Sequence, residues 1–188
     1  MQNVCVFCGS SPGKDPVFMQ AANDLGVAMG SASLGLVYGG AHVGLMGQVA
    51  DAVLATGQKV VGVIPKAFAH EVSHKGLTKL HLVDSMHARK AMMFELAGAC
   101  IALPGGFGTL EELTEVLTWA QLEFHQKPIG LLNINGYYDA LLDFFDQAAL
   151  AGFIKPQHLE LLLVHHDPTQ LLQLLKDYKP QAITKWSH

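Results

Sequence analysis

The sequence predicts an α/β fold built on one doubly wound parallel sheet. Short apolar runs without polar alternation recur along the chain, and segments with helical spacing separate them. Such runs form strands that are buried on both faces, as in a Rossmann-like parallel sheet flanked by helices. The chain has 188 residues, of which 50% are hydrophobic, so one core can be buried without disulfides. We expect a single domain over residues 1–178 and a C-terminal tail over residues 179–188.

The first half of the chain repeats a unit of strand, loop and helix. Each unit has an apolar run, a break at glycine or proline, and a segment whose apolar residues recur at helical spacing. The expected strands are residues 4–8, 34–38 and 59–64, and the expected helices are residues 15–30 and 45–54. After the break at Pro65, residues 66–85 are polar, rich in histidine and without a clear period. We interpret this long connection as a candidate lid over an active site.

The second half continues the same alternation. The expected helices are residues 86–98, 110–124, 137–152 and 168–178, and the expected strands are residues 100–103, 128–132 and 161–164. Asp167 followed by Pro168 favours the start of the last helix. Ligands of such sheets bind outside the carboxyl ends of the strands. We therefore expect the loops at Gly9, Gly39–Gly40 and Gly105–Gly106 to converge on one crevice.

Composition and charge exclude several classes of function. Charged residues make up 15% of the chain and the net charge is -4, so there is no basic surface for a nucleic-acid polymer. The N-terminus lacks the features of a signal peptide, and no apolar stretch approaches the roughly 18 residues of a membrane span. We expect a cytoplasmic protein without membrane partners. Cys5 and Cys8 are expected on opposite faces of a strand, and the ten histidines show no metal-binding spacing, so we expect no metal site.

The loop at residues 39–44 (GGAHVG) precedes a helix and indicates an anion site. Leu45 stands where a phosphate-binding Walker loop needs its lysine, and residues 59–64 lack the acidic residue of a dinucleotide fold. The free N–H groups at the helix start still favour a single phosphate, although glycines that only relieve strain in a turn are the alternative. The candidate phosphate-loop residues are Gly9, Ser10, Gly39, Gly40, Gly44 and Met46.

The loop at residues 104–112 (PGGFGTLEE) has two interpretations. Thr109 and Glu112 have the spacing of a capping box, in which each side chain bonds the other residue's backbone N–H. Periodicity alone favours this capping role and leaves Glu111, Glu112 and Glu115 off the core. The expected buried stripe of the helix is Leu110, Leu113, Val116, Leu117 and Ala120.

The same nine-residue string is also the P-G-G-x-G-T-x-x-E signature of a known family. With residues 86–90 (MHARK), 8–11 (CGSS), 44–47 (GLMG) and 63–65 (VIP), it resembles the "Lonely guy" family of cytokinin riboside 5'-monophosphate phosphoribohydrolases, long mislabelled lysine decarboxylases. The resemblance runs from about residue 2 to residue 178. It implies hydrolysis of N6-substituted adenosine monophosphates to the free base and ribose 5-phosphate. It also implies a homodimer or larger oligomer without a cofactor, whose small-molecule partner is a nucleoside monophosphate.

The resemblance implies that Arg89 and Glu112 are the catalytic pair. The residues that it places in the substrate pocket are Glu71, Arg89, Lys90, Gly106, Phe107, Gly108, Thr109, Leu110, Glu111, Glu112 and Thr118. Breaking the bond at C1' builds positive charge on the ribose. A carboxylate near that carbon stabilises this charge or activates the attacking water. The planar donors of Arg89 can orient the phosphate, the ribose or Glu112.

Three alternatives remain at this point. Arg89 and Lys90 have the structural interpretation of a solvated helix start. A pyridoxal-phosphate decarboxylase needs a Schiff-base lysine, and Lys90 is the only lysine inside a motif. A nucleotide-sensing or carrier module of the same fold would bind the nucleotide without cleaving it. Because Arg89 and Glu112 are both present, the sequence favours hydrolysis.

Overall fold

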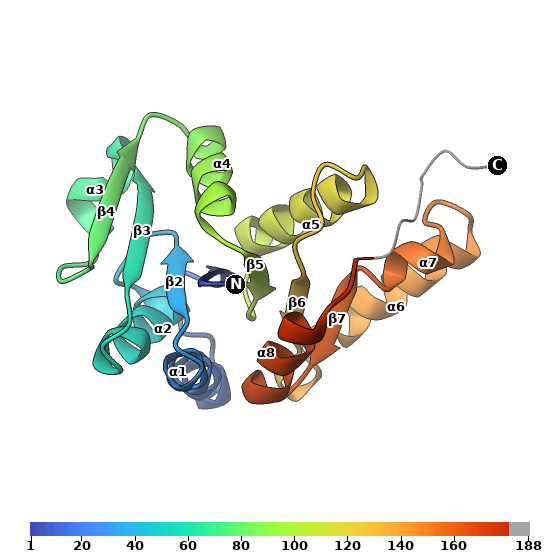
Figure 1. Ribbon diagram of the computed structural model, residues 1–188, viewed down its shortest axis with the longest axis horizontal. Coiled ribbons are helices and arrows are strands. Elements are labelled where there is room, and N and C mark those ends of the chain that lie inside the picture. Colours follow the sequence, from blue (N-terminus) through green and yellow to red (C-terminus); the bar gives the residue numbers. More distant parts are fainter. Residues whose placement is uncertain (181–188) are drawn as a thin grey trace.

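The computed structural model describes residues 1–180, so residues 181–188 of the expected tail lie outside it. Seven strands form one sheet in the order β4-β3-β2-β1-β5-β6-β7 (Figure 1), and every neighbouring pair is parallel. Six of the strands lie at the apolar runs identified above. The strands are β1 (Asn3–Phe7), β2 (Gly35–Tyr38), β3 (Val60–Pro65), β4 (Lys79–Val83), β5 (Ala99–Ala102), β6 (Ile129–Leu132) and β7 (Leu162–His165).

The helices cover both faces of the sheet. They are α1 (Pro16–Ser31), α2 (Gly44–Ala55), α3 (Lys66–Val72), α4 (Met86–Leu96), α5 (Phe107–Gln121), α6 (Asp139–Leu150), α7 (Pro156–Leu159) and α8 (Pro168–Asp177), with a 3-10 turn, η1 (Ile134–Gly136). Asp15 and Asp167 cap α1 and α8, and a proline follows each of them. Among residues 1–180, no helix is long and apolar enough to cross a membrane.

Two hydrophobic layers enclose the sheet. The layer beneath α1, α2 and α8 receives Val4, Val6 and Cys8, and the layer beneath α4, α5 and α6 receives Cys5 and Phe7 (Figure 1). Successive side chains of β1 therefore enter opposite layers, as the side-chain alternation of a strand requires. This confirms the doubly wound sheet and the expectation that Cys5 and Cys8 point to opposite faces.

The connection at residues 66–85 is not an irregular lid. It contains the short helix α3 and the strand β4, which pairs in parallel with β3 at the edge of the sheet. Because one side of an edge strand is open, β4 alternates polar and apolar residues and has only Val83 buried. The sequence search for continuous apolar runs missed β4 for this reason, and it also missed the four-residue helix α7.

The strand order reverses direction between β1 and β5, which creates the switch point of a doubly wound sheet. The loops that follow these two strands are joined by a hydrogen bond from Gly9 N to the Pro104 carbonyl, at 3.0 Å. Leu45 N, at the start of α2, donates to the Gly9 carbonyl at 3.1 Å. The loops after β1, β2 and β5 thus converge, as predicted.

Candidate active site

A cavity of about 320 Å³ lies where these loops meet. It is lined by residues 9–13 and 104–106, together with Phe18, Leu45 and Tyr137. The hydroxyl of Tyr137 donates to the Gly105 carbonyl at 2.7 Å and holds the second loop in place. The predicted phosphate residues Gly9 and Ser10 are thus adjacent to the P-G-G loop in a cavity of small-ligand size.

Three glycines of the converging loops have steric reasons to be glycine. At Gly39 an added Cβ would overlap the guanidinium of Arg89, and at Gly105 it would overlap the hydroxyl of Thr109. Gly44 has a φ of +55°, and a Cβ there would overlap the backbone of Ser10. The glycines therefore do more than relieve turn strain, because they allow backbone and functional side chains to approach closely.

Arg89 and Glu112 form a buried ion pair across two helices. Arg89 lies in the first turn of α4, which Ser85 caps by accepting from Ala88 N at 3.1 Å. Its Nη1 donates to Glu112 Oε1 at 3.3 Å, and its Nε donates to the Val63 carbonyl at 3.2 Å, at the end of β3. The two side chains are only 14% and 8% exposed, so a solvated helix start is excluded for Arg89.

The capping interpretation of the P-G-G loop is wrong. The helix α5 begins at Phe107 with Gly106 as its N-cap, and no side chain caps it. Thr109 therefore lies inside the first turn and is buried against Gly105. Glu112 is buried as well and does not lie off the core, because the inner face of α5 consists of Thr109, Glu112, Leu113 and Val116. The predicted apolar stripe is confirmed, because Leu113 and Val116 are buried and Leu110, Leu117 and Ala120 pack against the same core.

Lys90 pairs with the two other glutamates of this turn. Its ammonium bonds the carboxylates of Glu111 and of Glu115, the latter at 3.0 Å, and the lysine side chain is 9% exposed. Lys90 is thus no solvated helix residue either. In the described part of the chain, no three His, Cys, Asp or Glu side chains gather where they could hold a metal ion.

Burial controls the electrostatics of the pair. It raises the pKa of Glu112 to about 7, and Arg89 opposes this shift by stabilising the carboxylate. Glu111 and Glu115 raise the pKa of Glu112 further, whereas Lys90 lowers it. Burial also raises the pKa of the nearby thiols of Cys5 and Cys8, so both remain neutral at physiological pH. Glu112 therefore changes its charge within the physiological pH range.

Comparisons with known proteins assign the chain to a family. The family described as "Possible lysine decarboxylase" matches residues 46–175. A probable cytokinin riboside 5'-monophosphate phosphoribohydrolase of Oryza sativa subsp. japonica is 48% identical over 181 residues, covering 96% of this chain and 74% of that protein. A cytokinin riboside 5'-monophosphate phosphoribohydrolase of Arabidopsis thaliana is also 48% identical, over 96% of this chain and 83% of its own. This chain belongs to the cytokinin riboside 5'-monophosphate phosphoribohydrolase family.

Solved structures share the fold of this phosphoribohydrolase family member. The molybdenum cofactor binding protein of Rippkaea orientalis matches with a TM-score of 0.69 and 23% identity, over 93% of this chain and 95% of that chain. The Moco carrier protein of Chlamydomonas reinhardtii matches with a TM-score of 0.71 and 19% identity, over the same shares. At these identities the likeness shows the fold alone.

Three residues that the family resemblance assigns to the substrate pocket are not buried beside the ion pair. Thr118 lines a second, mostly apolar cavity of about 340 Å³ beside His158, and its hydroxyl donates to the Thr114 carbonyl at 2.7 Å. Glu71 is exposed on α3, and Phe107 is 94% exposed at the start of α5. The folded chain thus brings together Arg89, Glu112 and the glycine loops, but not Thr118.

Sequence reasoning missed several residues that hold the site. His74 Nε2 lies 3.0 Å from Asp51 Oδ1, and His74 N donates to the Gly40 carbonyl at 2.9 Å. The segment after α3 is therefore fastened to the loop at Gly39–Gly40. The hydroxyl of Tyr138 donates to the Leu103 carbonyl at 2.7 Å, just before the P-G-G loop. For the two tyrosines the sequence did offer a signal, because Tyr137 and Tyr138 follow β6, the strand beside β5.

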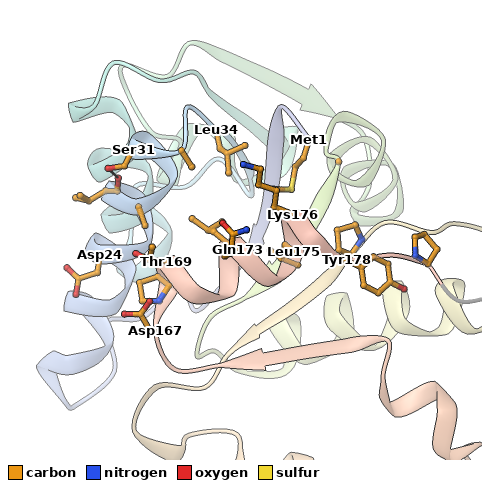
Figure 2. A pocket seen from close by; sticks show the side chains of 18 of the residues that line it. Met1, Asp24, Ser31, Leu34, Asp167, Thr169, Gln173, Leu175, Lys176 and Tyr178 are labelled. Carbon is orange, nitrogen blue, oxygen red and sulfur yellow. Dashed lines mark hydrogen bonds between the residues drawn. The ribbon is translucent and has the colours of Figure 1, made fainter.

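A wider cavity of about 990 Å³ lies at the other end of the sheet. Figure 2 shows it between α1, with Ser31, and α8, with Gln173. Met1 and Leu34, which precede β1 and β2, also line it, so it opens at the amino ends of the strands. Ligands of doubly wound sheets bind at the carboxyl ends, and none of the motif residues of this family lines the wider cavity. Its size therefore does not make it the active site.

Proposed function

We propose that this chain hydrolyses the N-glycosidic bond of adenosine 5'-monophosphate and its N6-substituted derivatives. Water adds to C1' of the ribose, the base leaves with a proton, and the products are the free base and ribose 5-phosphate. The buried Arg89–Glu112 pair, next to the glycine loops at the carboxyl ends of the strands, carries this proposal. Relatives that are 48% identical to the chain are named for this reaction.

Each part of the site has a chemical task in this reaction. The cavity at residues 9–13 and 104–106 supplies backbone donors for the 5'-phosphate. The carboxylate of Glu112 stabilises the positive charge that develops at C1', or removes a proton from the attacking water. Arg89 fixes this carboxylate through Nη1, while its Nε is held by the Val63 carbonyl. The remaining guanidinium nitrogen, Nη2, lies against Gly39 and so faces the phosphate loops.

The geometry disfavours the two alternative functions. A Schiff-base lysine must be a neutral amine when it attacks. The pKa of Lys90 is instead raised by its bonds to Glu111 and Glu115, against the effect of burial. A carrier that binds without cleaving has no need of a buried carboxylate held by an arginine. Glu112 is buried at an energetic cost that catalysis explains and passive binding does not.

The reaction class is tested by substrate comparison. We expect the purified protein to release adenine from AMP in the presence of EDTA, as followed by chromatography of the free base. Adenosine should react at least about a hundredfold more slowly, because the contacts of the glycine loops with the phosphate contribute to transition-state binding. Isopentenyladenosine monophosphate, assayed in parallel, reports the preference for the base. Equal rates on AMP and adenosine, or loss of activity in EDTA, would contradict the proposal.

The activity should depend on pH through Glu112. The reaction needs the carboxylate, and the pKa of Glu112 in the free protein is raised to about 7. We therefore expect kcat/KM for AMP to increase tenfold per pH unit below this value and to level off above it. Rates measured from pH 5.5 to 9, with melting temperatures at each pH as the control for unfolding, test this. A profile that is flat from pH 5.5 to 8 would remove Glu112 from the role of base or charge stabiliser.

We also propose a homodimer as the assembly. Several large apolar side chains are exposed, among them Phe107, Phe124, Leu150 and Phe153. Such a quantity of exposed apolar surface is characteristic of a surface that a partner covers. Light scattering at micromolar concentration should give about twice the 20.2 kDa of the chain. A mass near that of the single chain would refute the dimer and leave the reaction untouched.

A further inference from the structure

Three glutamates of α5 crowd the position at which the reaction is proposed to occur. Glu111 and Glu115 are one helical turn apart and lie on the same side of α5, whereas Glu112 is turned about 100° away. Like charges at this spacing repel, and the repulsion is strongest where water is excluded. Glu112 is the most buried of the three, so its charge depends most on how the other two are compensated.

Two neighbouring cations of α4 divide the three carboxylates between them. Arg89 bonds Glu112 and the Val63 carbonyl. Lys90 bonds Glu111 and Glu115, with its side chain 9% exposed. A compact ammonium with three donors can bridge two separate carboxylates, whereas the planar guanidinium suits one fixed partner. Arg89 and Lys90, although adjacent in the sequence, therefore bond different carboxylates.

We propose that Lys90 is a positioning residue that holds Glu111 and Glu115 as its own ion pairs and so leaves Glu112 free to act as the reactive carboxylate. The inference deepens the proposed function and rests on it, because Lys90 acts here through Glu112. It differs from direct contact with the substrate, because the family resemblance implies only that Lys90 lies in the substrate pocket. The buried ammonium is already engaged by two carboxylates, which makes it a poor phosphate ligand.

The effect of Lys90 on Glu112 has a definite sign. The charged or titratable groups that act on Glu112 are Arg89 and Lys90 from α4, Glu111 and Glu115 from α5, and the neutral thiols of Cys5 and Cys8 from the β1 side. Without Lys90, the two other carboxylates are no longer compensated, and both raise the pKa of Glu112. A smaller fraction of Glu112 is then ionised at neutral pH, so turnover slows there and recovers as the pH rises.

The test compares the pH profile of Lys90→Met with that of the wild type. We expect the midpoint of kcat/KM for AMP to shift upward by about one pH unit, which is about a fivefold loss at pH 7 and little loss at pH 9. KM for AMP at pH 9 should change less than about threefold. The triple variant Lys90→Met/Glu111→Gln/Glu115→Gln should restore the midpoint. Lys90→Arg is the conservative control and should keep the midpoint close to that of the wild type, because the positive charge that compensates the carboxylates is retained even where the bridging geometry is not.

A titration of the Glu112 carboxyl carbon by NMR, with glutamate labelled with carbon-13 and no substrate present, measures the same shift without activity. It therefore separates the two proposals, because a wild type that hydrolyses no nucleotide refutes only the proposed function. If Lys90→Met does not fold, Glu111→Gln/Glu115→Gln with Lys90 intact should shift the carboxyl titration downward. A phosphate-binding role for Lys90 predicts instead an unchanged midpoint, a KM raised about tenfold or more and no rescue in the triple variant. That result would overturn the inference.

Discussion

The Glu112→Gln variant is expected to bind AMP but to turn it over at least about a hundredfold more slowly than the wild type. Glutamine retains the size and the hydrogen bond to Arg89 but has no charge to offer at C1' and no basicity toward water. Loss of one preorganised electrostatic contact costs on the order of 10² to 10³ in rate. Turnover by chromatography and AMP affinity by calorimetry, on the same preparation, separate catalysis from binding.

The same variant should keep its melting temperature within a few degrees. A carboxyl whose pKa is raised in the folded state lowers stability progressively as the pH rises from its unfolded value, near 4.5, to about 7. Above pH 7 the neutral glutamine removes this cost, which offsets the loss of the negative charge beside Arg89. Glu95→Gln, at an exposed position of α4, is the matched control and should change neither rate nor stability. Near-normal turnover by a well-folded Glu112→Gln protein would return the role to Glu71, Glu111 or bound water.

The Arg89→Lys variant should lose about a hundredfold in kcat/KM, although it keeps the positive charge. Arg89 spans the Val63 carbonyl and Glu112 with two different nitrogens, and a single ammonium cannot reproduce this bridge. Arg89→Met serves as the comparison without charge. If lysine restores most of the rate that methionine loses, the charge matters and the bridge does not.

Chemical modification gives an independent check on Arg89, because it is the single arginine of the sequence. Phenylglyoxal, which reacts with guanidinium groups, should inactivate the enzyme in step with the modification of Arg89. Saturating AMP should slow this inactivation, since the substrate covers the crevice. Full modification of Arg89 with retained activity would show that the guanidinium does not take part.

The sequence by itself determined the sheet and the place of the candidate site in it. Apolar runs such as residues 4–8 and 34–38 are local patterns, and burial on both faces follows from their composition alone. The rule that ligands bind at the carboxyl ends of parallel strands then predicted the convergence of the Gly9, Gly39–Gly40 and Gly105–Gly106 loops. The family signature added the pairing of Arg89 with Glu112, which the fold brings within hydrogen-bonding distance.

Only the tertiary structure decided which polar residues are buried and with whom. Periodicity put Glu112 off the core because a lone charge inside a protein is unfavourable, and its partner lies 23 residues away on another helix. The strand β4 was not predicted because, at the edge of the sheet, only Val83 of its residues is buried and it has no continuous apolar run. Thr118 shares a helix with Glu112 but faces another cavity. The family resemblance places Lys90 in the substrate pocket, whereas the fold pairs it with Glu111 and Glu115. Burial and charge pairing are properties of contacts between distant segments, so no local pattern in the chain encodes them.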